Sequence, residues 1–140
     1  MPVRKAVVTW TGGRDGAGEV RLGSGTPALR YTWASRFEEE AGSNPEELLA
    51  GALASCFAMA LASRLTRNNA PPKTLTASAE ATVEKVEGDW AITGIALRLR
   101  GDVPGMTLAD LTPHAEAAKA GCPVSRALKA IPIELVVEAG

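Results

Sequence analysis

Cys56 and Cys122 are the two cysteines of this 140-residue chain and the residues best suited by type to do chemistry. A thiolate is a nucleophile that can be oxidised to a sulfenic acid or joined in a disulfide. Two cysteines are too few for a disulfide framework, and a chain of this length does not need one. In a reducing compartment they are either two unrelated buried thiols or a redox pair. A metal site is disfavoured, because His114 is the sole histidine and no Cys-x-x-Cys occurs.

The two cysteines have different sequence surroundings. Cys56 lies inside an apolar stretch, where a cysteine is most often an inert buried thiol whose pKa is raised by burial. To react there, it needs a fixed cation nearby, such as an arginine. Cys122 lies between Gly121 and Pro123, at the expected start of a short helix, where free N–H groups favour a thiolate. A plain helix cap is the alternative at Cys122, but on local physics alone it is the better nucleophile.

The first third of the chain is predicted to form a β-meander. Residues 5–10, 19–22 and 28–33 have the composition and alternation of short strands, and a turn with three glycines follows the first of them at 11–16. These strands precede the segment that carries Cys56.

A long helix is predicted to position Cys56. Asn44 is a suitable N-cap, Pro45 suits the first helical position, and Glu47 falls at the third position of a capping box. Residues 48–65 are nearly all apolar or small, and a helix that is apolar all round is expected to be buried all round. Its small residues would let neighbours approach closely, including the same helix of a second chain.

The second half of the chain is predicted to be a β-hairpin followed by two helices and a strand. Residues 75–83 alternate with period two, Gly88-Asp89 is a turn signal, and residues 91–100 form the second strand. Helices at 108–120 and 123–130 and a strand at 131–137 complete the chain. Strands and helices do not alternate, so the sequence predicts one α+β domain over residues 1–140 with a largely antiparallel sheet.

The composition excludes some classes of partner. The chain has 15 basic and 16 acidic residues, so its net charge of −1 provides no general field for nucleic acid or an anionic membrane. We expect no signal peptide, and the apolar helix is too short and too rich in small residues to predict a membrane span. The expected location is the cytoplasm.

Each cysteine lies in a longer motif. The first motif runs from Arg-Phe-Glu at 36–38 through 42–49 to Ala-Ser-Cys-Phe-Ala-Met-Ala-Leu at 54–61, and the second is Lys-Ala-Gly-Cys-Pro-Val-Ser-Arg-Ala-Leu-Lys-Ala at 119–130. Both motifs resemble those of the OsmC/Ohr family of organic hydroperoxide resistance proteins. The motifs match in order, and the resemblance covers essentially the whole chain. The Asn-Pro-Glu-Glu-Leu and Cys-Pro-Val-Ser stretches favour the OsmC branch over the Ohr branch.

The resemblance implies a role for five residues. Cys56 would be the peroxidatic cysteine and Cys122 the resolving one. Arg36 would lie near the reactive sulfur, and Glu46 would hold that arginine. The Ohr branch instead carries its arginine in an early Gly-Gly-Arg turn, which makes Arg14 the reserve candidate. The ordinary alternatives are a solvated loop charge for Arg14 and a first-turn acid that interacts with the helix dipole for Glu46.

The resemblance also implies the reaction and its partners. The thiolate of Cys56 would reduce an organic hydroperoxide to an alcohol, and the resulting sulfenic acid would condense with Cys122 to a disulfide. A dithiol donor, which in the Ohr branch is a lipoylated protein, would reduce that disulfide. The reaction requires no metal, flavin or haem. An apolar pocket, which Phe57, Met59 and Leu61 or nearby residues could help line, would favour bulky hydroperoxides over H₂O₂.

The spacing of Glu46 and Cys56 bears on the oligomeric state. Ten positions on a straight helix separate two side chains by ~15 Å and ~80°. Either the helix breaks near Gly51, or Glu46 comes from a second, antiparallel chain, as in the intertwined homodimer of this family.

Three alternatives to a peroxidase are a dimer that binds a small apolar ligand without catalysis, a structural dimer with incidental thiols, and a thiol–disulfide oxidoreductase, which the lack of Cys-x-x-Cys disfavours most.

Overall fold

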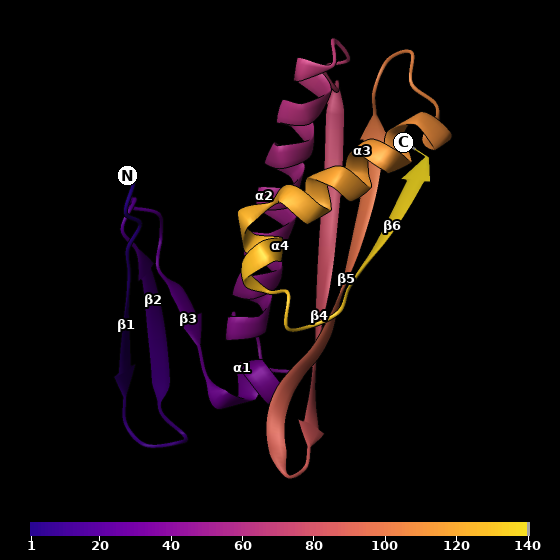
Figure 1. Cartoon of the computed structure of the whole chain (residues 1–140). Coiled ribbons are helices and arrows are strands. Elements are labelled where there is room, and N and C mark those ends of the chain that lie inside the picture. The colour runs from indigo at the N-terminus through magenta and orange to yellow at the C-terminus, as the bar shows by residue number, and fades with distance from the viewer. Residues whose placement is uncertain (140) are drawn as a thin grey trace. The chain divides into compact units, whose positions relative to one another are not determined.

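The computed structural model of the chain describes residues 1–139 and divides into two compact units, Met1–Leu48 and Leu49–Gly140. Figure 1 labels the elements along the chain. They are β1 (Ala6–Thr11), β2 (Ala17–Leu22), β3 (Leu29–Tyr31), α1 (Trp33–Phe37), α2 (Pro45–Arg67), β4 (Thr74–Val86), β5 (Asp89–Asp102), α3 (Leu108–Gly121), α4 (Pro123–Ala127) and β6 (Ile133–Ala139).

The first unit contains an antiparallel sheet with the strand order β1-β2-β3, which confirms the predicted meander. The third strand is shorter than predicted, because Thr32 ends it and caps α1, a helix that the sequence did not predict. The Thr32 hydroxyl accepts from the N–H of Ser35 at 3.0 Å, and the Ser35 hydroxyl accepts from the N–H of Thr32 at 2.8 Å. This reciprocal pair is a capping box with serine in place of the usual acid.

Helix α2 begins as predicted and runs without a break. The N–H of Glu47 donates to Oδ1 of Asn44 at 2.8 Å, and Pro45 is the first helical residue. The helix is continuous through Gly51 to Arg67, so the predicted alternative of a break near Gly51 is not found.

The second unit contains a sheet with the order β4-β5-β6. Strands β4 and β5 are antiparallel and joined by Glu87 and Gly88, which have φ of 51° and 90°. Two successive residues with positive φ are typical of the tight hairpin turn that matches the twist of the strands. The turn lies one residue earlier than predicted, because Asp89 already belongs to β5.

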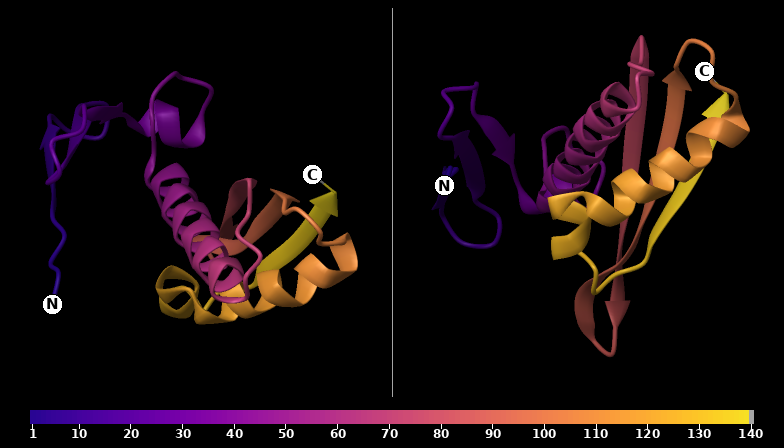
Figure 2. Two further views of the ribbon diagram at one scale, coloured as in Figure 1. Left: turned by 90° about the horizontal axis from the view of Figure 1, so that it is seen from above. Right: turned by 45° about the horizontal axis from the view of Figure 1, so that its top comes forward.

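Strand β6 runs parallel to β5, whereas the other strand pairs are antiparallel, in keeping with the predicted largely antiparallel sheet. The connection between β5 and β6 carries α3 and α4, as parallel strands require a crossover. In Figures 1 and 2, α2 and α3 lie against the same face of this sheet. The buried core cluster takes its residues from α2, β5, α3 and the residue just after β5: Phe57, Leu61, Leu65, Leu97, Leu99, Val103, Leu111, Ala115 and Ala118.

The prediction that α2 is buried all round is wrong for the single chain. One face of the helix contributes Leu53, Phe57 and Leu61, all with no exposed surface. The opposite face is open to solvent, and Met59 on it is 75% exposed. The exposed residues along this face follow helical spacing: Ala52, Ser55, Met59, Ser63 and Thr66. By length and composition alone α2 could cross a membrane, although its other face forms the core of the unit.

Candidate active site

The structure brings Cys56 and Cys122 together within the second unit. Cys56 lies on α2, and Cys122 lies at the junction where α3 ends and α4 begins. Both are free thiols, and their side chains interact closely enough that each shifts the pKa of the other. Cys56 is partly exposed, whereas Cys122 has no exposed surface. In the single chain, Cys56 is therefore the cysteine that is open to solutes, whereas Cys122 is sealed.

The surroundings shift the two thiol pKa values in opposite directions. Burial raises the pKa of Cys56, and the hydrogen bond with Cys122 raises it further. Burial also acts to raise the pKa of Cys122, but hydrogen bonds from Cys56, Ser125 and Val124 outweigh it and leave that pKa below its ordinary value. The local preference for a thiolate at Cys122 agrees with the sequence argument. Cys56 still needs a cation to ionise readily.

Arg36 and Glu46 form an ion pair within the first unit. Arg36 lies in the last turn of α1, and Glu46 lies in the first turn of α2. Nη2 of Arg36 donates to Oε1 of Glu46 at 2.6 Å, and Nε donates to both carboxylate oxygens at 3.1 Å. The guanidinium also lies over the ring of Phe37, 4.8 Å from its centroid. Because the Glu46 side chain is only 8% exposed and that of Arg36 is 34% exposed, the acid is fixed and the arginine remains accessible.

Arg14 lies in the turn between β1 and β2 and has a different partner. Its guanidinium carbon is 4.3 Å from the centroid of the Trp33 ring. Among residues 1–139 no carboxylate forms a salt bridge with it. Arg14 is thus an exposed, ring-stacked cation, whereas Arg36 is held by a buried acid.

The predicted site residues therefore fall into two groups. Arg14, Arg36 and Glu46 belong to the first unit, and Cys56 and Cys122 belong to the second. Each unit brings one predicted pair together. The first unit pairs Arg36 with Glu46, and the second brings Cys56 and Cys122 together.

Sequence reasoning missed two residues beside Cys122. The N–H groups of Val124 and Ser125 and the side chain of Ser125 favour the charged form of Cys122, which lowers its pKa. The signal was present in Gly-Cys-Pro-Val-Ser, because a helix that begins at Pro123 makes Cys122 its N-cap and Ser125 its third residue. Side chains at these two positions of a helix face each other, as in a capping box.

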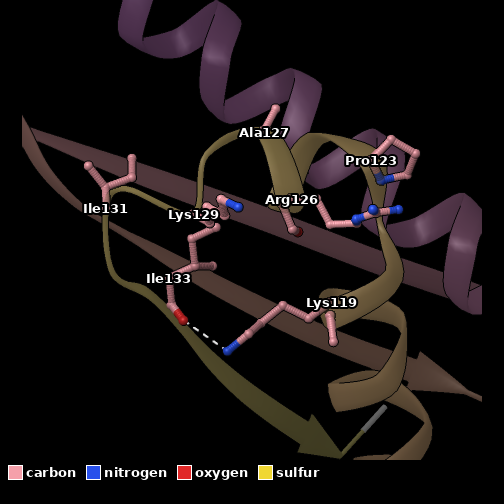
Figure 3. A pocket seen from close by; sticks show the side chains of 9 residues that line it. Lys119, Pro123, Arg126, Ala127, Lys129, Ile131 and Ile133 are labelled. Atoms are coloured by element: carbon pink, nitrogen blue, oxygen red, sulfur yellow. Dashed lines mark hydrogen bonds between the residues drawn. The ribbon is translucent and has the colours of Figure 1, made fainter.

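Of the three residues predicted to help line an apolar pocket, Phe57 and Leu61 are fully buried in the core of the single chain, and Met59 is exposed. A different, open cavity of about 750 Å³ lies beside α4. Figure 3 shows the cationic and apolar side chains that line this cavity. Nζ of Lys119 donates a hydrogen bond to the carbonyl of Ile133 at 2.9 Å. Its lining residues are Lys119, Ala120, Pro123, Ser125, Arg126, Ala127, Lys129, Ile131 and Ile133.

Comparison with known proteins places these features in context. A family model described as OsmC-like protein matches residues 38–136, a range that includes Glu46 and both cysteines and begins just after Arg36. Peroxiredoxin OsmC of Escherichia coli is 40% identical over 121 residues, which are 81% of this chain and 85% of that protein.

Solved structures share the fold. An organic hydroperoxide resistance protein from Elizabethkingia anophelis superposes with a TM-score of 0.80 at 24% identity and covers 99% of both chains. OhrB of Bacillus subtilis superposes with a TM-score of 0.76 at 24% identity, over 96% of this chain and 98% of the other. These similarities confirm the predicted α+β fold.

Proposed function

The chain belongs to the OsmC-like protein family, and we propose that it is a thiol peroxidase that reduces organic hydroperoxides to alcohols with Cys56 and Cys122. Its similarity to a peroxiredoxin at 40% identity supports a cysteine-based, peroxide-reducing enzyme. The observation that carries the proposal is the pair of free thiols whose side chains interact and shift each other's pKa, one of them partly exposed and the other buried.

In the first step, the thiolate of Cys56 attacks the distal oxygen of ROOH. The O–O bond breaks, the sulfur becomes a sulfenic acid, and the alkoxide takes a proton and leaves as ROH. Cys56 takes this role because a peroxide can reach its sulfur, while Cys122 is sealed from solvent. Exposure therefore outweighs the lower pKa of Cys122 in deciding which sulfur meets the substrate.

Arg36 is the proposed source of the positive charge that Cys56 lacks. The carboxylate of Glu46 binds Nε and Nη2 of Arg36, and this fixes the guanidinium while leaving Nη1 without a hydrogen-bond partner among the described residues. A fixed guanidinium beside a thiolate lowers the thiol pKa by stabilising the charged form. The buried partner of Arg36 supports this choice over Arg14, which has no acid to hold it.

In the second step, the Cys122 thiolate attacks the sulfur of the Cys56 sulfenic acid. The S–S bond forms, the S–O bond breaks, and the hydroxide takes a proton and leaves as water. A dithiol donor then reduces the disulfide by two thiol–disulfide exchanges and is itself oxidised to a disulfide. A lipoylated protein is the candidate donor, by analogy with the Ohr branch.

We further propose that the protein works as a two-fold homodimer in the cytoplasm. A second copy of α2 would cover the open face of Met59 and its small neighbours, and every residue of β1 is exposed in the single chain. Because α2 is unbroken at Gly51, Glu46 and Cys56 of one chain remain ten residues apart on one helix. An antiparallel partner would therefore supply the Arg36–Glu46 pair to each Cys56.

Peroxidase assays with a dithiol donor test the function. We expect faster turnover of cumene hydroperoxide than of H₂O₂, and no turnover of either by the Cys56→Ser variant. Equal or better turnover of H₂O₂ would contradict the organic-substrate specificity. Inactivity toward both peroxides with several dithiols would favour the non-catalytic ligand-binding dimer instead.

A further inference from the structure

Ser125 has a buried hydroxyl that the fold does not explain. The residue is 8% exposed and is the third residue of α4. Its Oγ is sealed from solvent and has no hydrogen-bond partner within the part of the chain that the structure describes. An unpaired buried hydroxyl is unfavourable, so most such groups in folded proteins have a partner.

The polar group beside this hydroxyl is the sulfur of Cys122. The Ser125 side chain acts on Cys122 together with the N–H groups of Val124 and Ser125, and all three favour the charged form of the sulfur. A hydroxyl hydrogen rotates about its C–O bond and can turn toward an acceptor when one develops. A thiolate is a much stronger acceptor than a thiol, so the hydrogen bond that Ser125 lacks in the neutral dithiol becomes available when Cys122 ionises.

We propose that Ser125 is a positioning residue for the resolving cysteine: its hydroxyl donates a hydrogen bond to the Cys122 thiolate in the step that forms the disulfide. The inference rests on the proposed function and deepens it. The hydrogen bond holds the sulfur in place while the S–S bond forms and the S–O bond of the Cys56 sulfenic acid breaks. The hydroxide leaves as water with a proton from solvent, and Ser125 keeps its own proton.

The same hydroxyl acts again when the enzyme is reduced. A donor thiolate attacks Cys56, whose sulfur is the accessible half of the disulfide, and Cys122 leaves with the electron pair. A leaving thiolate departs faster when its negative charge is stabilised. Ser125 therefore donates to Cys122 in both halves of the cycle. Cys122 is the nucleophile in the first half and the leaving group in the second.

A titration tests the inference without peroxide. In a Cys56→Ser background, thiolate ultraviolet absorbance reports ionisation of Cys122. Ser125→Thr and Ser125→Val have the same shape and differ in the hydroxyl. We expect the pKa of Cys122 to be higher in Ser125→Val than in Ser125→Thr. Ser125→Ala, which needs no extra space, should likewise titrate above the parent. Identical titrations for variants with and without the hydroxyl would overturn the inference.

A single-turnover experiment tests the kinetic role. After one equivalent of cumene hydroperoxide, sulfenic acid at Cys56 should form at the parent rate in Ser125→Val. Disulfide formation should be roughly three- to tenfold slower than in Ser125→Thr, because the thiolate fraction falls while the nucleophilicity of the remaining thiolate partly compensates. Ser78→Ala, at an exposed serine on β4, is the control and should match the parent. Equal rates of disulfide formation would contradict the role of Ser125. A parent that forms no sulfenic acid would instead contradict the proposed function, and the titration would still decide the inference.

Discussion

At the scale of single residues, accessibility and acidity are divided between the two cysteines. The sulfur of Cys56 is accessible but its pKa is raised, chiefly by burial, whereas the sulfur of Cys122 is sealed and its pKa is lowered by hydrogen bonds. An external cation at Cys56 is therefore essential to the account, and Arg36 is the candidate with a fixed geometry. Cys122 needs no such help, since its neighbours on α4 already stabilise its thiolate.

The opposite pKa shifts predict opposite dependences of stability on pH. In Cys56→Ser, Cys122 loses the contribution of the Cys56 side chain but keeps those of Ser125 and Val124, so we expect its folded-state pKa to stay below its ordinary value of 9.0. The unfolded chain then binds more protons just below pH 9.0, so the free energy of unfolding should rise with pH there and be lost as the pH falls. In Cys122→Ser, the raised pKa of Cys56 should make that free energy fall as the pH rises above 9.0.

Urea unfolding at a series of pH values under reducing conditions measures both slopes. The double variant Cys56→Ser/Cys122→Ser provides the baseline for all other titrating groups. Slopes of the same sign for the two single variants, after this baseline is subtracted, would show that the environments of the thiols are not as described.

The Arg36–Glu46 pair gives a prediction with a matched control in the next residue. Glu46→Gln removes the charge that fixes Arg36, and we expect the free energy of unfolding to fall by about 1.5–3 kcal/mol, the range for hydrogen bonds to charged groups. We also expect kcat/KM for cumene hydroperoxide to fall at least about tenfold, equivalent to about 1.4 kcal/mol. Glu47→Gln changes the same charge on an exposed residue and should leave kcat/KM near the parent value. Equal losses in both variants would remove the special role of Glu46.

Several site residues could be predicted from the sequence, and two were missed although the start of the helix that carries them was predicted. The cysteines stand out by type, and their motifs also include Arg36 and Glu46 through resemblance. Ser125 and Val124 act on Cys122 through hydrogen bonds that depend on where α4 begins. The predicted start at Pro123 already puts Ser125 at the third helical position, but the burial of its hydroxyl depends on packing that no local pattern encodes.

At the scale of elements, α2 depends on a well-formed N-terminus. The Asn44 side chain accepts from the N–H of Glu47 at 2.8 Å and donates to the carbonyl of Ser35 at 3.3 Å, so it links α1 to the start of α2. Asn44→Ala loses both hydrogen bonds, and we expect the free energy of unfolding to fall by about 1 kcal/mol. Asn44→Asp keeps the capping oxygen and should lose much less. Chemical denaturation of the parent, Asn44→Ala and Asn44→Asp measures the order of their stabilities. An alanine variant as stable as the parent would show that the cap contributes nothing.

Elements with strong local signals were predicted well, and those that depend on tertiary contacts were not. The start of α2 and the long hairpin were predicted, because caps, proline and strict alternation are local. Helix α1 was missed, since its capping box uses Ser35 where an acid is the usual signal. The parallel pairing of β6 with β5 depends on how α3 and α4 pack on the sheet, which no local pattern encodes.

At the scale of the whole molecule, the open face of α2 sets the expected assembly. The sequence predicted that α2 is buried on every side, but the single chain buries only one side of it. The remaining exposed face is the surface that a second chain would cover. Met59 lies on that surface and is 75% exposed. We expect the parent to sediment as a dimer and Met59→Lys to shift it toward monomer, because a charge would be buried at the helix contact.

A matched surface variant controls for the effect of adding a lysine. Val86 lies at the end of β4 beside the hairpin turn and is 46% exposed, so Val86→Lys should leave the sedimentation of the parent unchanged. If Met59→Lys is monomeric, its peroxidase activity should also fall, because each Cys56 would lose the partner's contribution to its site. A parent that sediments as a monomer and is fully active would contradict the dimeric site.

The most direct test of the central claim is a count of thiols after one turnover. Fully reduced protein receives one equivalent of cumene hydroperoxide, and free thiols and cross-linked peptides are measured by mass spectrometry. We expect the loss of both thiols in the parent with a Cys56–Cys122 disulfide, and in Cys122→Ser the loss of one thiol with a sulfenic acid at Cys56. Unchanged thiols in the parent, or oxidation of Cys122 at the parent rate in Cys56→Ser, would contradict it.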